Sequence, residues 1–239
     1  MTRIKPGFCM RLVCMLLLLA APAHAHHLWI TQSEGELGIA RGEMPDALES
    51  YRATAVKEAA AWDSAGHALP LTRQDRGARV LFRTDAPVAL ATVRCDWGLR
   101  VNTTEGKKLI DRRTAEDQGL TVIEAFFSTQ YSKTIFADSP LTTAPTGMLL
   151  EIVPVDNLLA ATAGQAVKVR LLFDHQPLSD TVVHFGHRRQ ARTDRDGIAV
   201  IDVPGTQAEL IWARHRVPVQ GDAEKNFILY TTFLVLAVK

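Results

Sequence analysis

Short segments in which apolar and polar residues alternate cover most of the chain and predict β-strands. Strands are expected at residues 28–31, 78–84, 86–94, 149–155, 166–173, 181–187, 198–203, 209–214 and 227–238. Asp85, between the second and third of these, predicts a hairpin. No helical segments alternate with the strands, which favours an all-β fold of the β-sandwich type.

Three segments depart from this pattern. Residues 46–62 are rich in Ala and Glu and fit either a short helix or an irregular excursion, while the charged residues 111–119 predict a loop. Proline, glycine, serine and threonine cluster at 137–147 and predict a linker. We therefore expect two sandwich domains, a β-rich one at 26–145 and an immunoglobulin- or transthyretin-like one at 146–239.

Residues 1–25 have the pattern of a cleaved export signal. Arg3, Lys5 and Arg11 precede an apolar run at 12–21, which is followed by small residues that end at Ala25. The apolar run is too short for a transmembrane helix. We expect a periplasmic protein whose mature chain begins at His26.

An N-terminal histidine can bind one metal ion through both its α-amine and its ring. Imidazole is a ligand for nickel, cobalt, copper and zinc, and the amine loses its proton at modest cost. Cleavage after Ala23 would instead give His24-Ala25-His26, in which the third-position histidine suits planar Cu(II) or Ni(II). Both cleavage positions predict metal binding.

Charge and cysteine content exclude some classes of protein. The chain has 27 basic and 26 acidic residues and no basic stripe along the sequence, which argues against a nucleic-acid-binding protein. Cys9 and Cys14 lie in the predicted signal, so Cys95 would remain alone and could form no internal disulfide. We expect Cys95 to be a buried apolar side chain.

Further metal ligands are harder to choose from the sequence. His27 adjoins His26, and His215 follows the predicted strand 209–214, where a side chain can reach the rim of a site. Any of several carboxylates could contribute, namely those of Glu34, Glu36, Glu43, Glu49, Asp63 and Glu124. The sequence contains no motif of a hydrolase, zinc protease or phosphate-binding loop, so we expect no enzyme.

Six segments carry a resemblance to a known family, namely His26 to Trp29, Tyr131-Ser132-Lys133, 150–157, 163–165, 169–178 and 193–197. They resemble a family of uncharacterised periplasmic domains described as associated with nickel or cobalt uptake (NikM-like). The resemblance implies a two-domain β protein that handles a transition metal, with the N-terminal histidine as first ligand. Relatives have Gly-His-Pro where this chain has Gly42-Glu43-Met44-Pro45, which makes Glu43 a candidate ligand here.

These observations together predict capture of nickel or cobalt, or secondarily copper, and its presentation to a membrane uptake system. The expected ligands are His26, His27, His215 and Glu43. One alternative is a copper oxidoreductase built on the N-terminal histidine, which would need a second histidine facing the first. The other is a binding or adhesion module without a metal.

Overall fold

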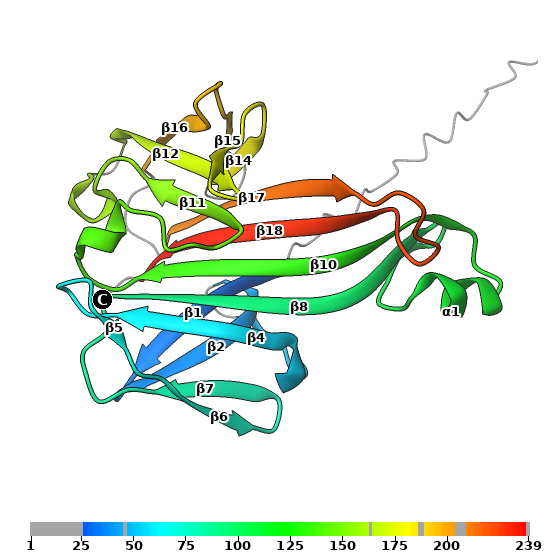
Figure 1. The fold of residues 1–239 in the computed structure, drawn as a ribbon, viewed down its shortest axis with the longest axis horizontal. Coiled ribbons are helices and arrows are strands. Elements are labelled where there is room, and N and C mark those ends of the chain that lie inside the picture. The colour runs from blue at the N-terminus through cyan, green and yellow to red at the C-terminus, as the bar shows by residue number, and fades with distance from the viewer. Residues whose placement is uncertain (1–25, 45–46, 163, 186–188, 204–208, 238–239) are drawn as a thin grey trace, which may run out of the picture.

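A computed structural model describes residues 26–44, 47–162, 164–185, 189–203 and 209–237. Its elements are almost all β-strands arranged in three sheets, so the all-β prediction is confirmed (Figure 1). The predicted signal at 1–25, with both cleavage positions, lies outside the described residues. In the described part of the chain, no helix is long and apolar enough to cross a membrane.

The first sheet contains the N-terminal strands. They are β1 (His27–Ser33), β2 (Glu36–Glu43), β3 (Ala47–Leu48), β6 (Thr72–Arg76) and β7 (Arg79–Arg83). Glu34 and Gly35 both have positive φ and join β1 to β2 as a two-residue turn, the geometry that matches the twist of a hairpin. This hairpin places the start of β1 next to the end of β2.

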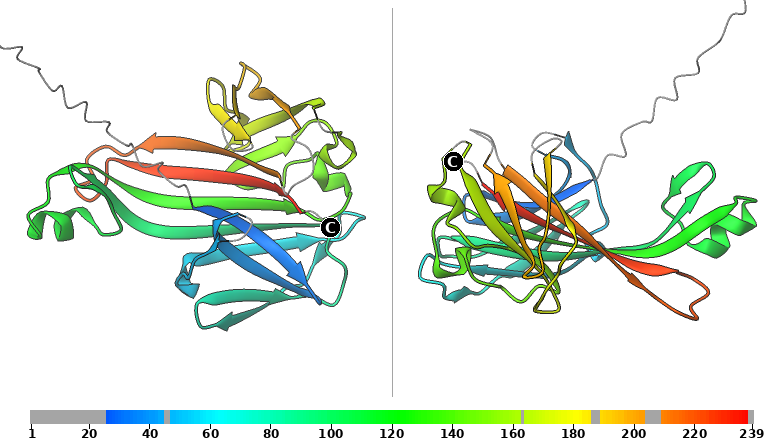
Figure 2. Two further views of the ribbon diagram at one scale, coloured as in Figure 1. Left: turned by 180° about the vertical axis from the view of Figure 1, so that it is seen from behind. Right: turned by 90° about the horizontal axis from the view of Figure 1, so that it is seen from above.

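The central sheet combines strands from both halves of the chain. They are β4 (Val56–Trp62), β5 (Ala68–Leu69), β8 (Leu90–Thr103), β9 (Gly106–Lys108), β10 (Val122–Ile135), β14 (Val182–Phe185), β15 (Arg189–Arg192), β17 (Glu209–Pro218) and β18 (Phe227–Leu236). Strands β10 and β18 pair in parallel and join the two halves. The division at 145/146 stays a prediction, but one continuous sheet runs across it (Figure 2).

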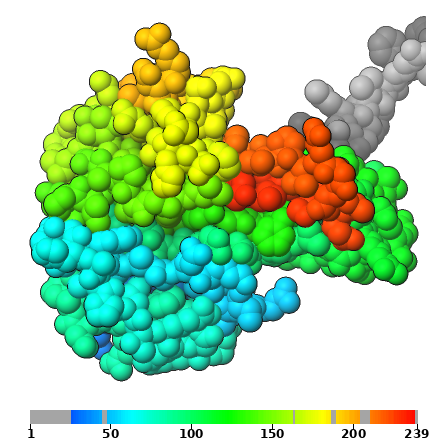
Figure 3. Space-filling model, in the orientation of Figure 1, coloured from blue at the N-terminus to red at the C-terminus, as the bar shows by residue number. Residues whose placement is uncertain are grey.

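The third sheet lies on the opposite side of the central sheet. It contains β11 (Leu150–Pro154), β12 (Ala166–Phe173), β13 (Gln176–Pro177) and β16 (Ile198–Asp202). Short 3-10 turns at Ala53–Ala55, Pro140–Thr142 and Leu158–Ala160 complete the connections. The first and third sheets gather at one end of the molecule, and the central strands project beyond them (Figures 1 and 3).

Alternation along β18 shows how one sheet serves two cores. Phe233 and Val235 pack with the first sheet, whereas Leu234 and Leu236 pack with the third sheet. Successive side chains of a strand point to opposite faces, so each face of the central sheet has its own apolar cluster. Cys95 lies buried in the first cluster with a free thiol, as expected.

A buried ion pair fixes the predicted linker. Lys133 of β10 and Glu151 of β11 are 0% and 1% exposed, and their Nζ and Oε1 atoms lie 3.2 Å apart. Glu151 also accepts hydrogen bonds from the backbone N–H groups of Thr146, Gly147 and Met148. Two of the segments that carry the family resemblance therefore meet in a structural contact.

Three local predictions were wrong. Residues 56–62, part of the segment expected to be a short helix or an irregular excursion, form strand β4. Residues 112–117, expected to be part of a loop, form helix α1 (Arg112–Asp117), and the Asp111 side chain accepts a hydrogen bond from Thr114 N at its start. The strands around Asp85 do not pair as a hairpin, because β7 pairs with β2 and β6 while β8 pairs with β4 and β10. Pro87, which lacks an N–H group, interrupts the expected strand.

Candidate functional site

His26 immediately precedes β1 and lies against strand β10. Gln130 Nε2 of β10 donates to the His26 carbonyl at 3.4 Å, and Ile30 N donates to Thr134 Oγ1 further along. The His26 ring is 38% exposed, and its Nδ1 lies 2.7 Å from Glu49 Oε1. These contacts hold the first described residue in place and bring Nδ1 close to a carboxylate, although Nδ1 forms no hydrogen bond with any described residue.

Burial lowers the pKa of His26 below its usual value. The positive charges of Arg41 and Lys107 lower this pKa further, while Glu49 and Glu43 act in the opposite direction. The ring is therefore neutral at pH 7, which is the form that binds metals. Arg41 shares Glu49, since its Nη1 donates to Glu49 Oε2 at 2.7 Å.

The other predicted ligands are placed differently. His27 Nδ1 accepts a hydrogen bond from Met44 N at 3.3 Å, and its ring edge faces Phe233. Glu43 is exposed at the end of β2, close enough to influence the pKa of His26. Within the described ranges, no group of three or more His, Cys, Asp or Glu side chains is arranged to hold a metal ion.

His215 is separated from His26 by the central sheet. Its ring packs 4.6 Å from that of Phe173, on the side of the third sheet. Its strand neighbours Arg214 and Arg216 point to the opposite face and line a groove with His26. The structure therefore brings His26, His27 and Glu43 to one end of the first sheet, whereas His215 lies elsewhere.

An open groove of about 580 Å³ adjoins His26. We call it the basic groove, because it is lined by His26, Arg41, Arg100, Lys107, Arg214 and Arg216. Its five cationic side chains come from β2, β8, β9 and β17. The groove thus depends on the pairing of strands from both halves of the chain.

A bulge in β8 turns Arg100 into the groove. Ser128 pairs with Gly98 and Thr129 with Asp96, so Trp97 is an extra residue in β8. Gly98 adopts a φ of +77°, a conformation that favours glycine at a bulge. The extra residue puts Arg100, beyond the bulge, on the face that Cys95 and Trp97 occupy.

Like charges in the groove lower one another's pKa values. Burial lowers the pKa of Arg100 to about 10, and Arg41 and Arg52 add to this effect. The pKa of Lys107 is lowered by burial first and then by Arg214, Arg100 and Arg41. These side chains therefore lie in one shared positive field.

Carboxylates neutralise only part of this charge. Arg41 pairs with Glu49, and Arg216 Nη1 lies 3.2 Å from Glu124 Oε2. In the part of the chain that the structure describes, no carboxylate lies within 4.0 Å of the charged nitrogens of Arg100, Lys107 and Arg214. Among the described residues, three groove cations thus lack a partner of opposite charge.

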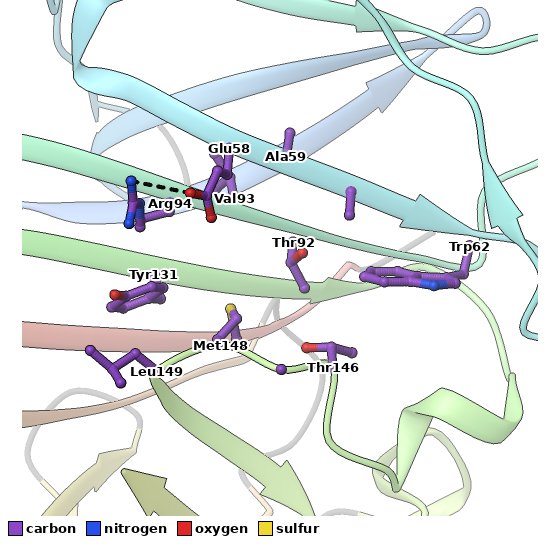
Figure 4. Close-up of a pocket in the computed structure, with 12 residues that line it drawn as sticks. Glu58, Ala59, Trp62, Thr92, Val93, Arg94, Tyr131, Thr146, Met148 and Leu149 are labelled. Carbon is purple, nitrogen blue, oxygen red and sulfur yellow. Dashed lines mark ion pairs between the residues drawn. The ribbon is translucent and has the colours of Figure 1, made fainter. Parts of the chain in front are cut away.

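A second pocket, of about 480 Å³, has a different character. It lies against the other face of the central sheet, between Trp62, Tyr131 and Met148 (Figure 4). Its two charged lining residues, Glu58 and Arg94, form an ion pair at 3.2 Å. Because this pair is internally balanced, the pocket presents no surplus of charge.

The sequence analysis missed the basic groove. Arg214 and Arg216 alternate along β17, a spacing that places both on one face of a strand. That spacing was the available signal. It does not show that Arg100 and Lys107, more than a hundred residues earlier, lie on the same face.

Fold and site together define an all-β protein with an open basic groove beside its first described histidine. The chain belongs to the family described as a domain of unknown function (DUF4198), which matches residues 23–216. Neither a curated protein nor a solved structure matches the chain. The expected membership of a family of uncharacterised domains is confirmed, and the matched region includes His26 and all five groove cations.

Proposed function

We propose that this protein binds a divalent transition metal ion after export and that His26 is the first ligand. Nickel or cobalt is the preferred ion and copper the second choice. Signal cleavage after Ala25 would free the His26 amine, which can close a chelate ring with Nδ1. The observation that carries the proposal is the 2.7 Å approach of Nδ1 to Glu49 Oε1.

Glu49 is the best candidate for a further ligand. Its carboxylate already faces the nitrogen that would close the chelate ring, although it must then loosen its contact with Arg41. Glu43 is a second candidate, since its charge reaches the His26 ring. His27 is less suitable, because its Nδ1 already accepts a hydrogen bond from Met44 N.

The exposure of His26 suits delivery rather than storage. A ring that is 38% exposed can exchange ligands with a partner without opening a hydrophobic core. We therefore propose a periplasmic carrier that presents its ion to a membrane uptake system. This role agrees with the resemblance to domains associated with nickel and cobalt uptake.

The test uses full-length protein exported to the periplasm, whose mass gives the mature N-terminus. Calorimetric titration with Ni²⁺, Co²⁺ and Cu²⁺ should show binding that His26→Ala weakens at least about tenfold. Adding one residue before His26 should have a similar effect, because it removes the amine from the chelate. His67→Ala is the matched control, since the His67 side chain pairs with Asp63 in an exposed loop.

Unchanged affinity in both His26 variants would overturn the proposal. Mature protein that begins at another residue would exclude the amine as a ligand. Peroxide-driven oxidation of a polysaccharide by the copper-loaded protein would instead favour the alternative of a copper oxidoreductase.

A further inference from the structure

We propose that the basic groove binds a small organic polyanion, a molecule with two or more carboxylate or phosphate groups on a carbon skeleton. This proposal does not rest on metal binding by His26. It rests on the charge, size and lining of the groove, and each of these points to the same class of ligand.

The first argument is the local surplus of charge. The whole chain carries 27 basic and 26 acidic residues. Five cations nevertheless line one groove, and within the described residues only two of them have a carboxylate partner. Holding unmatched like charges together costs stability, so a concentrated surplus in a nearly neutral protein indicates a ligand of opposite charge.

The second argument is the geometry of the cations. Arg41 and Arg214 lie over the rings of Trp97 and Trp212, each 4.7 Å from the ring centroid. Ring contacts orient a guanidinium group without cancelling its charge. The planar forks of such arginines bind carboxylate and phosphate groups through two parallel hydrogen bonds.

The third argument is the size and the apolar part of the lining. A volume of about 580 Å³ is within the range of small-molecule sites. Trp97, Phe126 and Leu229 also line the groove and can contact a carbon skeleton. An inorganic anion would leave these apolar surfaces unused, so an organic polyanion fits better.

The experiment titrates the metal-free protein, in buffer treated with a chelating resin, with citrate and separately with pyrophosphate. Citrate should bind more tightly than pyrophosphate, and its affinity should fall between about 50 and 300 mM NaCl. Trimethyl citrate, which lacks the charges, should not bind. The pyrophosphate arm separates an organic polyanion from an inorganic one.

The variants assign the site to the groove. Arg100→Gln and Arg214→Gln should each weaken citrate binding at least about tenfold, while thermal unfolding confirms that both fold. Arg113→Gln and Arg195→Gln are matched controls, because these side chains are 86% and 93% exposed and lie outside the groove. Because the protein is free of metal, this titration tests the groove separately from the proposed metal site.

Three outcomes would overturn the proposal. The first is no binding of citrate or pyrophosphate at about 50 mM NaCl. The second is an equal loss of affinity in the groove variants and the exposed controls. The third is binding of a DNA oligonucleotide but of neither small anion, which would make the groove a surface for a polymer.

Discussion

Lys133 and the cations of the basic groove all lie at the central sheet, but they differ in how far other groups of the protein balance their charges. Lys133 is fully buried and has both Glu151 and the Ala144 carbonyl as partners. Arg100 and Arg214 are more accessible and have no carboxylate partner among the described residues. A charge that is fully satisfied within the protein holds the fold together, whereas an unsatisfied one is available to a ligand.

Breaking the buried pair should have the largest effect. Glu151→Gln leaves Lys133 buried without a counter-charge and weakens the hydrogen bonds from Thr146, Gly147 and Met148. We expect the free energy of unfolding to fall by about 3–5 kcal/mol in denaturant titrations.

The same substitution in an exposed pair is the control. Glu58 is 69% exposed and pairs with Arg94, so Glu58→Gln should change the free energy of unfolding by less than about 1 kcal/mol. Equal losses of stability in the two variants would show that the buried pair contributes no more to stability than the exposed pair.

Removing a positive charge from the groove should raise the stability of the protein instead of lowering it. Arg214→Gln relieves repulsion by Arg216 and lowers the positive field around Lys107. We expect slightly higher stability, by about 0.5 kcal/mol, and two- to threefold tighter binding of bare Ni²⁺ at His26, on the order of 0.5 kcal/mol. A fall in stability would mean that Arg214 is a structural residue like Lys133.

Acidification should affect the histidines more than the buried pair. Burial lowers the pKa of His26, His184 and His215, and Arg41 or Arg214 lowers the first two further. The unfolded chain then takes up protons first as pH falls below about 6.5, so stability should decrease from pH 7.5 to pH 5.5.

Melting temperatures across this pH range provide the measurement. His184→Gln should make the melting temperature depend less on pH. The wild-type His184 ring is stacked 3.8 Å from Trp212 and can take up a proton on acidification, whereas glutamine cannot. His67→Gln, at an exposed loop position, serves as the control. A wild-type melting temperature that rises on acidification would contradict the expected sign.

Local patterns were enough to predict many of the strands. Residues 166–173 alternate between exposed and buried positions and form β12 over the expected range. The polar segment 111–119 shows the limit of this approach, because a helix of one or two turns has too few residues for a clear period. Its signal was instead the cap formed by Asp111 and Thr114.

The candidate site could be predicted only in part. His26 was found because it follows a predicted processing signal, whereas Glu49 was only one of six candidate carboxylates, among which the family resemblance favoured Glu43. In the structure Glu49 lies beside His26, because β2 returns the chain to the start of β1 and β3, which directly precedes Glu49, pairs with the end of β2. The basic groove further requires the parallel pairing of β10 with β18, which no local pattern encodes.

The smallest effect on ligand binding is expected at His215, where the sequence predicted a ligand and the structure shows a packed ring. His215→Ala removes contacts with Phe173 on the face opposite the groove, so stability should fall by about 1 kcal/mol. Calorimetric affinities for Ni²⁺ and citrate should stay within about twofold of wild type, a difference below 0.5 kcal/mol. A tenfold loss of Ni²⁺ affinity would instead place a ligand on that face, and the two faces of the central sheet could no longer be assigned separate roles.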